Sequence, residues 1–369
     1  MGSTVAAVLA VVVAVAVGPV PGAAASGAAA SGASASGAAA SGAAASGAAE
    51  RPGAPCTPVA ARACEAVPSS QRARSGPGLG DPSPFYVDPT TPAAQQVREW
   101  LDQGRVEDAE RVDRIASQPQ PLWVSADPSE VGAQVAEYVT RARAARARPL
   151  LVAYNIPNRD CGSYSGGGAG GAAEYREWVA ELASGFGDSV PLLVLEPDAI
   201  PQQISGCTRD AGRYGLLADA VEVLGDAGAD VYVDAGHPQY VPDVDVIADA
   251  LDRAGVREAA GFALNVSNFI STEENIEYGT AISERLGGAH FVVDTSRNGA
   301  ATEPEVDEGP AWCNPPDREI GEPPTTDTGD PLVDALLWIK RPGESDGACR
   351  GEDPPAGGWY PDYALDLTD

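Results

Sequence analysis

Three aspartates recur along the chain at nearly equal spacing. Asp160, Asp198 and Asp234 lie 38 and 36 residues apart, which is close to the length of one strand-helix unit. If each follows a parallel strand, the three carboxylates lie above neighbouring strands that are about 5 Å apart. Carboxylates this close together cannot all ionise easily, so the pKa of one of them is expected to rise.

A carboxyl group that stays protonated near neutral pH can protonate a poor leaving group. Pairs of carboxyl groups that share this work are typical of glycoside hydrolysis. The spacing of the three aspartates therefore indicates that class of reaction.

Short apolar runs predict the strands that position these residues. Runs without polar alternation suit parallel strands buried on both faces. The clearest helix between them begins after Asp243 and ends at Gly255. Alternating strands and helices predict an α/β fold, either a parallel barrel or an open doubly wound sheet. The predicted strands are Pro121–Val124, Leu150–Tyr154, Pro191–Leu195, Val231–Val233, Gly261–Leu264, Phe291–Val293 and Ala335–Ile339.

Polar or ionisable residues follow six of these runs. Asp and Asn at such places commonly cap the next helix or start a turn. Six together favour an active site at the carboxyl ends of the strands, where barrel enzymes carry it. The six are Tyr154-Asn155, Glu196 to Asp198, Asp234, Asn265, Asp294-Thr295 and Lys340.

Six tryptophans divide into two groups. Trp123, Trp312 and Trp359 lie at strand ends or in loops, where flat aromatic faces can bind sugar rings, although packing within a loop explains them equally well. Trp100, Trp178 and Trp338 lie in helix or strand patterns, and we expect them in the core.

The charge of the chain excludes some partners. With 53 acidic and 24 basic residues the net charge is -29, which repels nucleic acid and anionic membrane surfaces. Lys340 is the single lysine.

The first 78 residues predict export and a spacer. Residues 1–25 resemble a signal peptide: 13 apolar residues from Val5 to Val17 precede small residues, although no Lys or Arg comes before Arg51. The apolar run is too short for a membrane span. Residues 26–55 form an Ala/Ser/Gly-rich linker, and residues 56–78 a short lead-in to a catalytic domain over 79–369. We expect a secreted, extracellular monomer.

Six cysteines fit an oxidising compartment. Fifteen pairings are possible, and we expect neighbours in the sequence to pair. The chain has no Cys-x-x-Cys motif and only two histidines, His237 and His290, which argues against a zinc site. The cysteines are Cys56, Cys64, Cys161, Cys207, Cys313 and Cys349.

Seven motifs in order strongly resemble glycoside hydrolase family 6, the inverting cellulases. They are YNIPNRDC at 154–161, LEPD at 195–198, YVDAGH at 232–237, NVSNF at 265–269, DTSRNG at 294–299, WCNP at 312–315 and WIKRPGESDG at 338–347. The resemblance implies a distorted parallel barrel of about seven strands that cleaves β-1,4-glucan with inversion, without a metal or other cofactor.

The resemblance also implies roles for single residues. Asp198 matches the general acid, and Asp160 the neighbouring carboxylate that raises the pKa of that acid and helps to place the water. Asp346 matches the proposed base, with a water chain to Asp160 as the rival. Tyr154 matches the tyrosine that distorts the reacting sugar. Substrate-groove positions are matched by Trp123, His237, Asn265, Trp312, Lys340 and Glu344, and Asp234 matches a supporting carboxylate.

The family pairs Cys161 with Cys207 and Cys313 with Cys349, each pair bracketing an active-site loop. The two cysteine pairs would close segments of 46 and 36 residues. Segments of this length look like those of endo-acting members, which have short loops and an open cleft. One departure is Ala348, which separates Gly347 from Cys349 where the family usually runs Gly-Cys, so the loop carrying Asp346 is expected to shift.

We therefore expect an endo-1,4-β-glucanase. A cellobiohydrolase of the same family is the nearest alternative. A non-catalytic glucan-binding protein would lose the acids that this chain keeps, and a metal-dependent sugar isomerase or deacetylase would need histidine ligands at a spacing that it lacks.

Overall fold

The computed structural model describes residues 79, 84–208, 210, 212–300, 306 and 309–369. The expected signal peptide, linker and lead-in, with Cys56 and Cys64, lie outside these residues. The elements in chain order are α1 (Pro92–Asp102), α2 (Val106–Ala116), β1 (Leu122–Val124), α3 (Pro128–Ala144), β2 (Leu150–Ala153), a 3-10 helix (Asp160–Gly162), α4 (Ala172–Ser184), β3 (Leu192–Leu195), α5 (Ala199–Ser205), α6 (Arg213–Asp226), β4 (Asp230–Asp234), α7 (Val244–Arg253), β5 (Gly261–Leu264), α8 (Thr272–Arg285), β6 (His290–Asp294), β7 (Val333–Leu337) and α9 (Pro361–Asp366).

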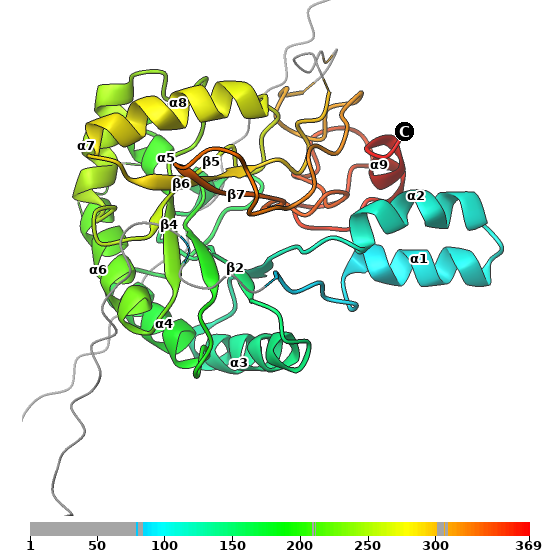
Figure 1. Cartoon of the computed structure of the whole chain (residues 1–369), viewed down its shortest axis with the longest axis horizontal. Helices are drawn as coiled ribbons and strands as arrows, with labels where there is room; N and C mark the ends of the chain where they lie inside the picture. Colours follow the sequence, from blue (N-terminus) through cyan, green and yellow to red (C-terminus); the bar gives the residue numbers. More distant parts are fainter. Residues whose placement is uncertain (1–78, 80–83, 209, 211, 301–305, 307–308) are drawn as a thin grey trace, which may run out of the picture. The chain divides into compact units, whose positions relative to one another are not determined.

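The seven strands form one parallel sheet in the order β1 to β7. The sheet curls into a distorted barrel, and α3, α4, α6, α7 and α8 cover its outer face (Figure 1). Because each strand pairs with the next one along the chain, the order has no reversal of the kind that defines an open doubly wound sheet. The predicted barrel of about seven strands is confirmed.

The strand bounds agree with the sequence to within two residues. Gly261–Leu264 is observed as predicted, whereas β7 ends at Leu337 instead of Ile339. The reason is local: the backbone amides of Ile339 and Lys340 donate to the carboxylate of Asp294 instead of continuing the sheet.

The clearest predicted helix is also observed. It is α7, and the Asp243 side chain caps it by accepting hydrogen bonds from the backbone amides of residues two and three further on. This cap supplies acceptors for amides that have no partner within the helix.

Alternate residues of the strands point to opposite faces of the sheet. Leu150 and Val152 fill the barrel interior, whereas Leu151 and Ala153 pack against the outer helices. Trp100, Trp178 and Trp338 are all buried, as expected.

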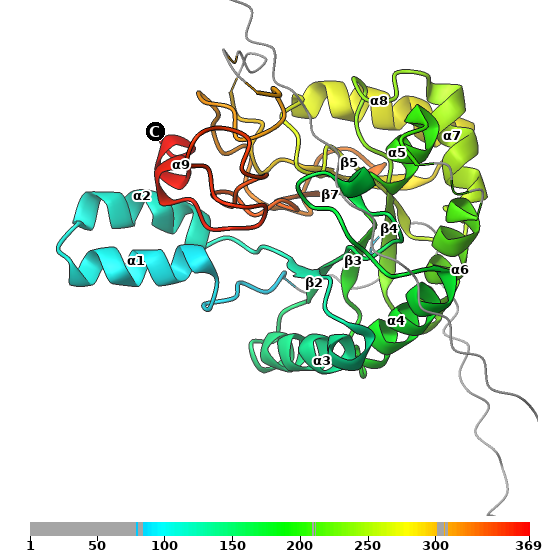
Figure 2. The same cartoon turned by 180° about the vertical axis from the view of Figure 1, so that it is seen from behind.

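The barrel is open between β7 and β1, since no ladder joins these two strands within the described residues. The Trp123 indole Nε1 crosses this seam and donates to the Ile339 carbonyl oxygen at 2.9 Å. Helices α1 and α2 lie beside α9 on this side of the molecule (Figure 2). No helix of the described part of the chain is both long and apolar enough to span a bilayer.

Gly261 provides a test of strand packing. A Cβ placed there would lie 2.0 Å from the His290 carbonyl oxygen, which belongs to the neighbouring strand β6. Because the clash is with backbone, the two strands must move apart, and we expect Gly261→Ala to lower the free energy of unfolding by about 2 to 3 kcal/mol. Urea denaturation measures the change.

The matched control is Gly215→Ala, in helix α6, where a Cβ has open space. Alanine favours a helix by up to about 1 kcal/mol over glycine, so this variant should be as stable as the parent or more so. Equal stability of the two variants would contradict this account of the β5–β6 contact.

Candidate active site

A cavity of about 900 Å³ opens at the carboxyl ends of the strands. Its walls come from the segments that follow all seven strands, from Ser125 after β1 to Lys340 after β7. The cavity collects nine of the eleven catalytic and substrate residues predicted from the sequence. These are Trp123, Tyr154, Asp160, Asp198, His237, Trp312, Lys340, Glu344 and Asp346.

Asp198 lies directly before α5, with a left-handed backbone (φ 66°). Its amide donates to Asp234 Oδ2 at 2.8 Å, which fixes this unusual conformation. Burial, together with the charge of Asp160, raises the pKa of Asp198 to about 7. Asp198 therefore holds a proton at a pH where an ordinary aspartate is ionised.

Asp160 opens the 3-10 helix after β2, and its Oδ2 accepts the Ser165 amide at 2.7 Å. Burial raises the pKa of Asp160 above its ordinary value. The Cys161–Cys207 disulfide ties this turn to the segment that follows α5, so Asp160 and Asp198 are carried by covalently linked loops.

Asp346 has an opposite environment. Arg297 Nη1 lies 2.7 Å and Lys340 Nζ 3.2 Å from its carboxylate, and the Asn314 amide donates to it at 3.0 Å. Burial raises the pKa of Asp346, but the two cations and these hydrogen bonds outweigh it, so the pKa lies below the ordinary value. Asp346 therefore stays ionised.

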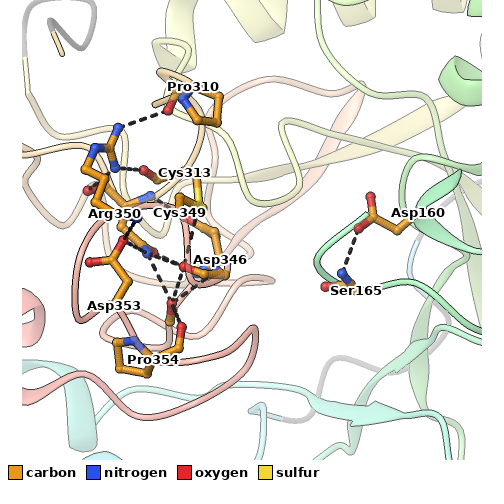
Figure 3. Close-up of a disulfide and its surroundings, with 12 residues drawn as sticks. Asp160, Ser165, Pro310, Cys313, Asp346, Cys349, Arg350, Asp353 and Pro354 are labelled. Carbon is orange, nitrogen blue, oxygen red and sulfur yellow. Dashed lines mark hydrogen bonds between the residues drawn. A yellow bond between two sulfur atoms is a disulfide. The ribbon is translucent and has the colours of Figure 1, made fainter. Parts of the chain in front are cut away.

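The second disulfide, Cys313–Cys349, stands beside Asp346, and Asp160 with Ser165 lies on the other side of the close-up in Figure 3. Asn314 joins the two segments by donating to the Gly347 carbonyl and accepting the Asp346 amide. Gly347, Ala348 and Cys349 form a tight turn, in which the Cys349 amide donates to the Gly347 carbonyl at 2.9 Å. Both disulfides implied by the family resemblance are present.

Aromatic side chains form one wall near β1 and β2. Trp123 and Tyr154 meet edge to face, with ring centroids 5.3 Å apart. The Arg159 guanidinium lies over the Tyr154 ring and also donates a hydrogen bond to the backbone carbonyl oxygen of Tyr154. Trp359 lies elsewhere: its indole donates to Gln96 and it packs with the α1–α2–α9 cluster.

Three further cleft residues, His237, Lys340 and Glu344, differ in charge. Burial lowers the pKa of His237 to about 4, so its imidazole is neutral at neutral pH. Lys340 donates to the Ser345 carbonyl at 3.1 Å besides contacting Asp346. Glu344 pairs with Arg341 at 2.9 Å.

Two predicted residues lie behind the cleft wall. Asn265 is fully buried, and its amide nitrogen donates to the Ile270 and Asp294 carbonyls. Asp234 is also buried, and its Oδ2 accepts the amides of Asp198 and Gly236. In this structure both side chains hold neighbouring loops.

Sequence reasoning assigned no role to Glu196 and Asp294. Glu196 accepts the Asn155 and Ile156 amides after β2. Asp294 accepts four amides, from Ser267, Ser296, Ile339 and Lys340, in the loops after β5, β6 and β7. The sequence does show both residues at the ends of predicted strands, and this position is what could have indicated their roles.

Arg297 was also missed. It is fully buried beside Asp346, and its Nη2 donates to the Ser267 carbonyl. Among the described residues, no group of three or more His, Cys, Asp or Glu side chains is placed to hold a metal ion.

A parallel barrel whose cleft holds one carboxyl group of raised pKa, Asp198, and one carboxylate of lowered pKa, Asp346, has the arrangement of a glycoside hydrolase. The chain belongs to the glycosyl hydrolases family 6, whose model matches residues 81–369.

Characterised relatives agree with this assignment. The chain is 45% identical to Endoglucanase A of Cellulomonas fimi, over 78% of this chain and 61% of that protein. It is 40% identical to Endoglucanase A of Thermobispora bispora, over 80% of this chain and 64% of that protein. The chain thus spans less than two thirds of the length of these two relatives.

The chain is also similar to a solved structure of an endoglucanase. The endoglucanase Cel6 from Mycobacterium tuberculosis, in complex with methyl-cellobiosyl-4-deoxy-4-thio-β-D-cellobioside, is 43% identical with a TM-score of 0.72. The match covers 78% of this chain and 96% of that one.

The buried ion pair at Asp346 can be tested directly. Arg297→Met removes one partner and leaves the Asp346 carboxylate buried with less compensation. We expect the free energy of unfolding to fall by about 3 to 5 kcal/mol, as for other broken buried pairs. Chemical denaturation followed by circular dichroism measures it.

Arg176→Met is the control. Its pair with Asp219 is about half exposed on both sides, and exposed pairs contribute less than about 1 kcal/mol. If the two variants lost similar stability, the special position of Arg297 would be refuted.

Proposed function

We propose that the chain is a β-1,4-glucanase that cuts internal bonds of cellulose-type glucans with inversion, and that Asp198 is its general acid. The observation that carries the proposal is the raised pKa of Asp198, about 7, in a cleft that also holds Asp160. An acid with a pKa near the working pH is protonated and can still release its proton readily.

Asp160 and Asp346 have different roles in activating the attacking water. In an inverting enzyme, one carboxylate takes a proton from the attacking water while the acid protonates the leaving oxygen. Asp160 is the better proton acceptor, because burial raises its pKa, whereas Arg297 and Lys340 depress that of Asp346. We assign Asp160 as the group that receives the proton, directly or through a water, and Asp346 as the fixed charge that holds Lys340 and Arg297.

The other cleft residues suit a neutral sugar chain. In this proposal Trp123 and Trp312 offer flat faces for pyranose rings, and Tyr154, whose ring contacts Trp123, presses on the reacting sugar. Lys340, His237 and Glu344 supply polar contacts, while Asp234 and Asn265 support the wall from behind.

The glucan assignment and the endo mode draw on the relatives. The cello-oligosaccharide analogue bound by the Mycobacterium tuberculosis protein supports β-1,4-glucan as the substrate class. The three proteins compared above, which are 40 to 45% identical to this chain, are all named endoglucanases, and this supports internal cleavage over the cellobiohydrolase alternative.

We further propose that the protein acts outside the cell as a monomer. Two disulfides beside the cleft support an oxidising compartment. In this proposal residues 1–25 direct export, 26–55 are a spacer, and 56–78, with a Cys56–Cys64 pair, lead into the catalytic domain.

The role of Asp198 predicts a dependence on the leaving group. In Asp198→Ala the rate on cellohexaose should fall by about 10² to 10⁴. The rate on 2,4-dinitrophenyl β-cellobioside should fall far less, because its phenolate leaves without a proton. Initial rates on the two substrates measure the difference.

Asp219→Ala, an exposed change on α6, is the control and should keep both rates. Proton NMR of the wild-type reaction should show the α-anomer first. Near wild-type rates of Asp198→Ala on cellohexaose would refute the acid, an early β-anomer would refute inversion, and no wild-type product would favour the glucan-binding alternative.

A further inference from the structure

Tyr164 lines the cleft, and none of the roles proposed above involves it. It belongs to a loop between β2 and α4, here called the Tyr164 loop (residues 155–171). Across the cleft stands the Trp312 loop (residues 309–316), which lies between β6 and β7. The two loops are separated by four strands of the barrel, yet they meet at these two side chains.

The contact is between aromatic rings. The centroids of Tyr164 and Trp312 lie 5.9 Å apart with planes at 63°, an edge-to-face pair. Tyr164 is 45% and Trp312 44% exposed, so much of each ring remains available to a ligand in the cleft.

The Tyr164 ring packs against the backbone of Gly347. A Cβ on Gly347 would lie 2.5 Å from Tyr164 Cγ, so the ring rests on bare backbone directly after Asp346. That backbone is fixed, since the Gly347 carbonyl accepts a hydrogen bond from Asn314. Tyr164 therefore touches both segments joined by the Cys313–Cys349 disulfide.

The Tyr164 loop links this contact to the catalytic carboxylates. Asp160 accepts the Ser165 amide, so Asp160 and Tyr164 belong to one hydrogen-bonded turn next to the Cys161–Cys207 disulfide. Further along, six of the ten residues 162–171 are glycine. Arg159 holds this part of the loop, because its side chain donates to the Ser165 carbonyl and its backbone amide to the Gly167 carbonyl.

We propose that Tyr164 is a specificity-determining residue that bridges the cleft. Its ring, resting on Gly347 and meeting Trp312, encloses the glucan beside the scissile bond and retains it after a cut, so that several cuts follow one encounter. The same contact sets the position of the Asp160 turn relative to Asp346. This inference rests on the proposed glucanase function.

The test compares Tyr164→Ala with Tyr164→Phe. The alanine variant removes the bridge, and we expect KM for cellohexaose to rise about 3- to 10-fold, the equivalent of one aromatic contact. On carboxymethyl-cellulose it should lose more viscosity per reducing end released, because each encounter yields fewer cuts. Tyr164→Phe keeps the ring and should match the wild type in both measurements.

Controls separate the bridge from general damage. Leu101→Ala removes an equally exposed side chain on α1, outside the cleft, and should change neither measurement. Thermal melting shows whether each variant is folded. If Tyr164→Ala does not fold, Tyr164→Ser and Tyr164→Leu are measured in the same way.

A double-mutant cycle adds an independent criterion. Trp312→Ala and Tyr164→Ala should each raise KM, and the double variant should raise it by less than the product of the two, because both remove one contact. Independent effects, or wild-type KM and viscosity ratio in Tyr164→Ala, would overturn the bridge alone. Absence of any wild-type cleavage of glucan would overturn the proposed function as well.

Discussion

The active site depends on buried carboxylates that accept backbone amides at the ends of strands. Glu196 holds the loop after β2, Asp234 the loop after β3, and Asp294 the loops after β5, β6 and β7. Each side chain thereby ties the segment that follows another strand. In a barrel that is open between β7 and β1, these bonds fix loops that the sheet itself does not join, and an unsatisfied buried amide or carboxylate would be costly.

The cleft also separates two kinds of carboxylate. Burial and the charge of Asp160 raise the pKa of Asp198, while burial and the charge of Asp198 raise the pKa of Asp234, whose Oδ2 accepts the Asp198 amide. Asp346 lies between Arg297 and Lys340 and stays charged. One fold thus provides a proton donor and a fixed anion from the same side-chain type, because burial and neighbouring cations act in opposite directions.

Much of this could be predicted from the sequence, because the signals were local. Apolar runs gave strands to within two residues, and the spacing of Asp160, Asp198 and Asp234 placed them after successive strands. The functions of Glu196, Asp294 and Arg297 could not be read in this way. Their partners lie about 30 to 50 residues away along the chain, and only the register of the barrel brings them together. The Tyr164–Trp312 contact, which crosses the cleft, could not be predicted from the sequence for the same reason.

The most direct test of this account is the titration of Asp198 itself. Carbon-13 NMR of protein labelled at the aspartate carboxyl carbons, with Asp198→Asn to assign the signal, would follow its protonation. We predict a transition near pH 7, which moves to lower pH in Asp160→Asn because the neighbouring charge is lost. A transition near pH 4, the ordinary value for aspartate, unaffected by Asp160→Asn, would contradict the claim that burial and Asp160 make Asp198 the acid.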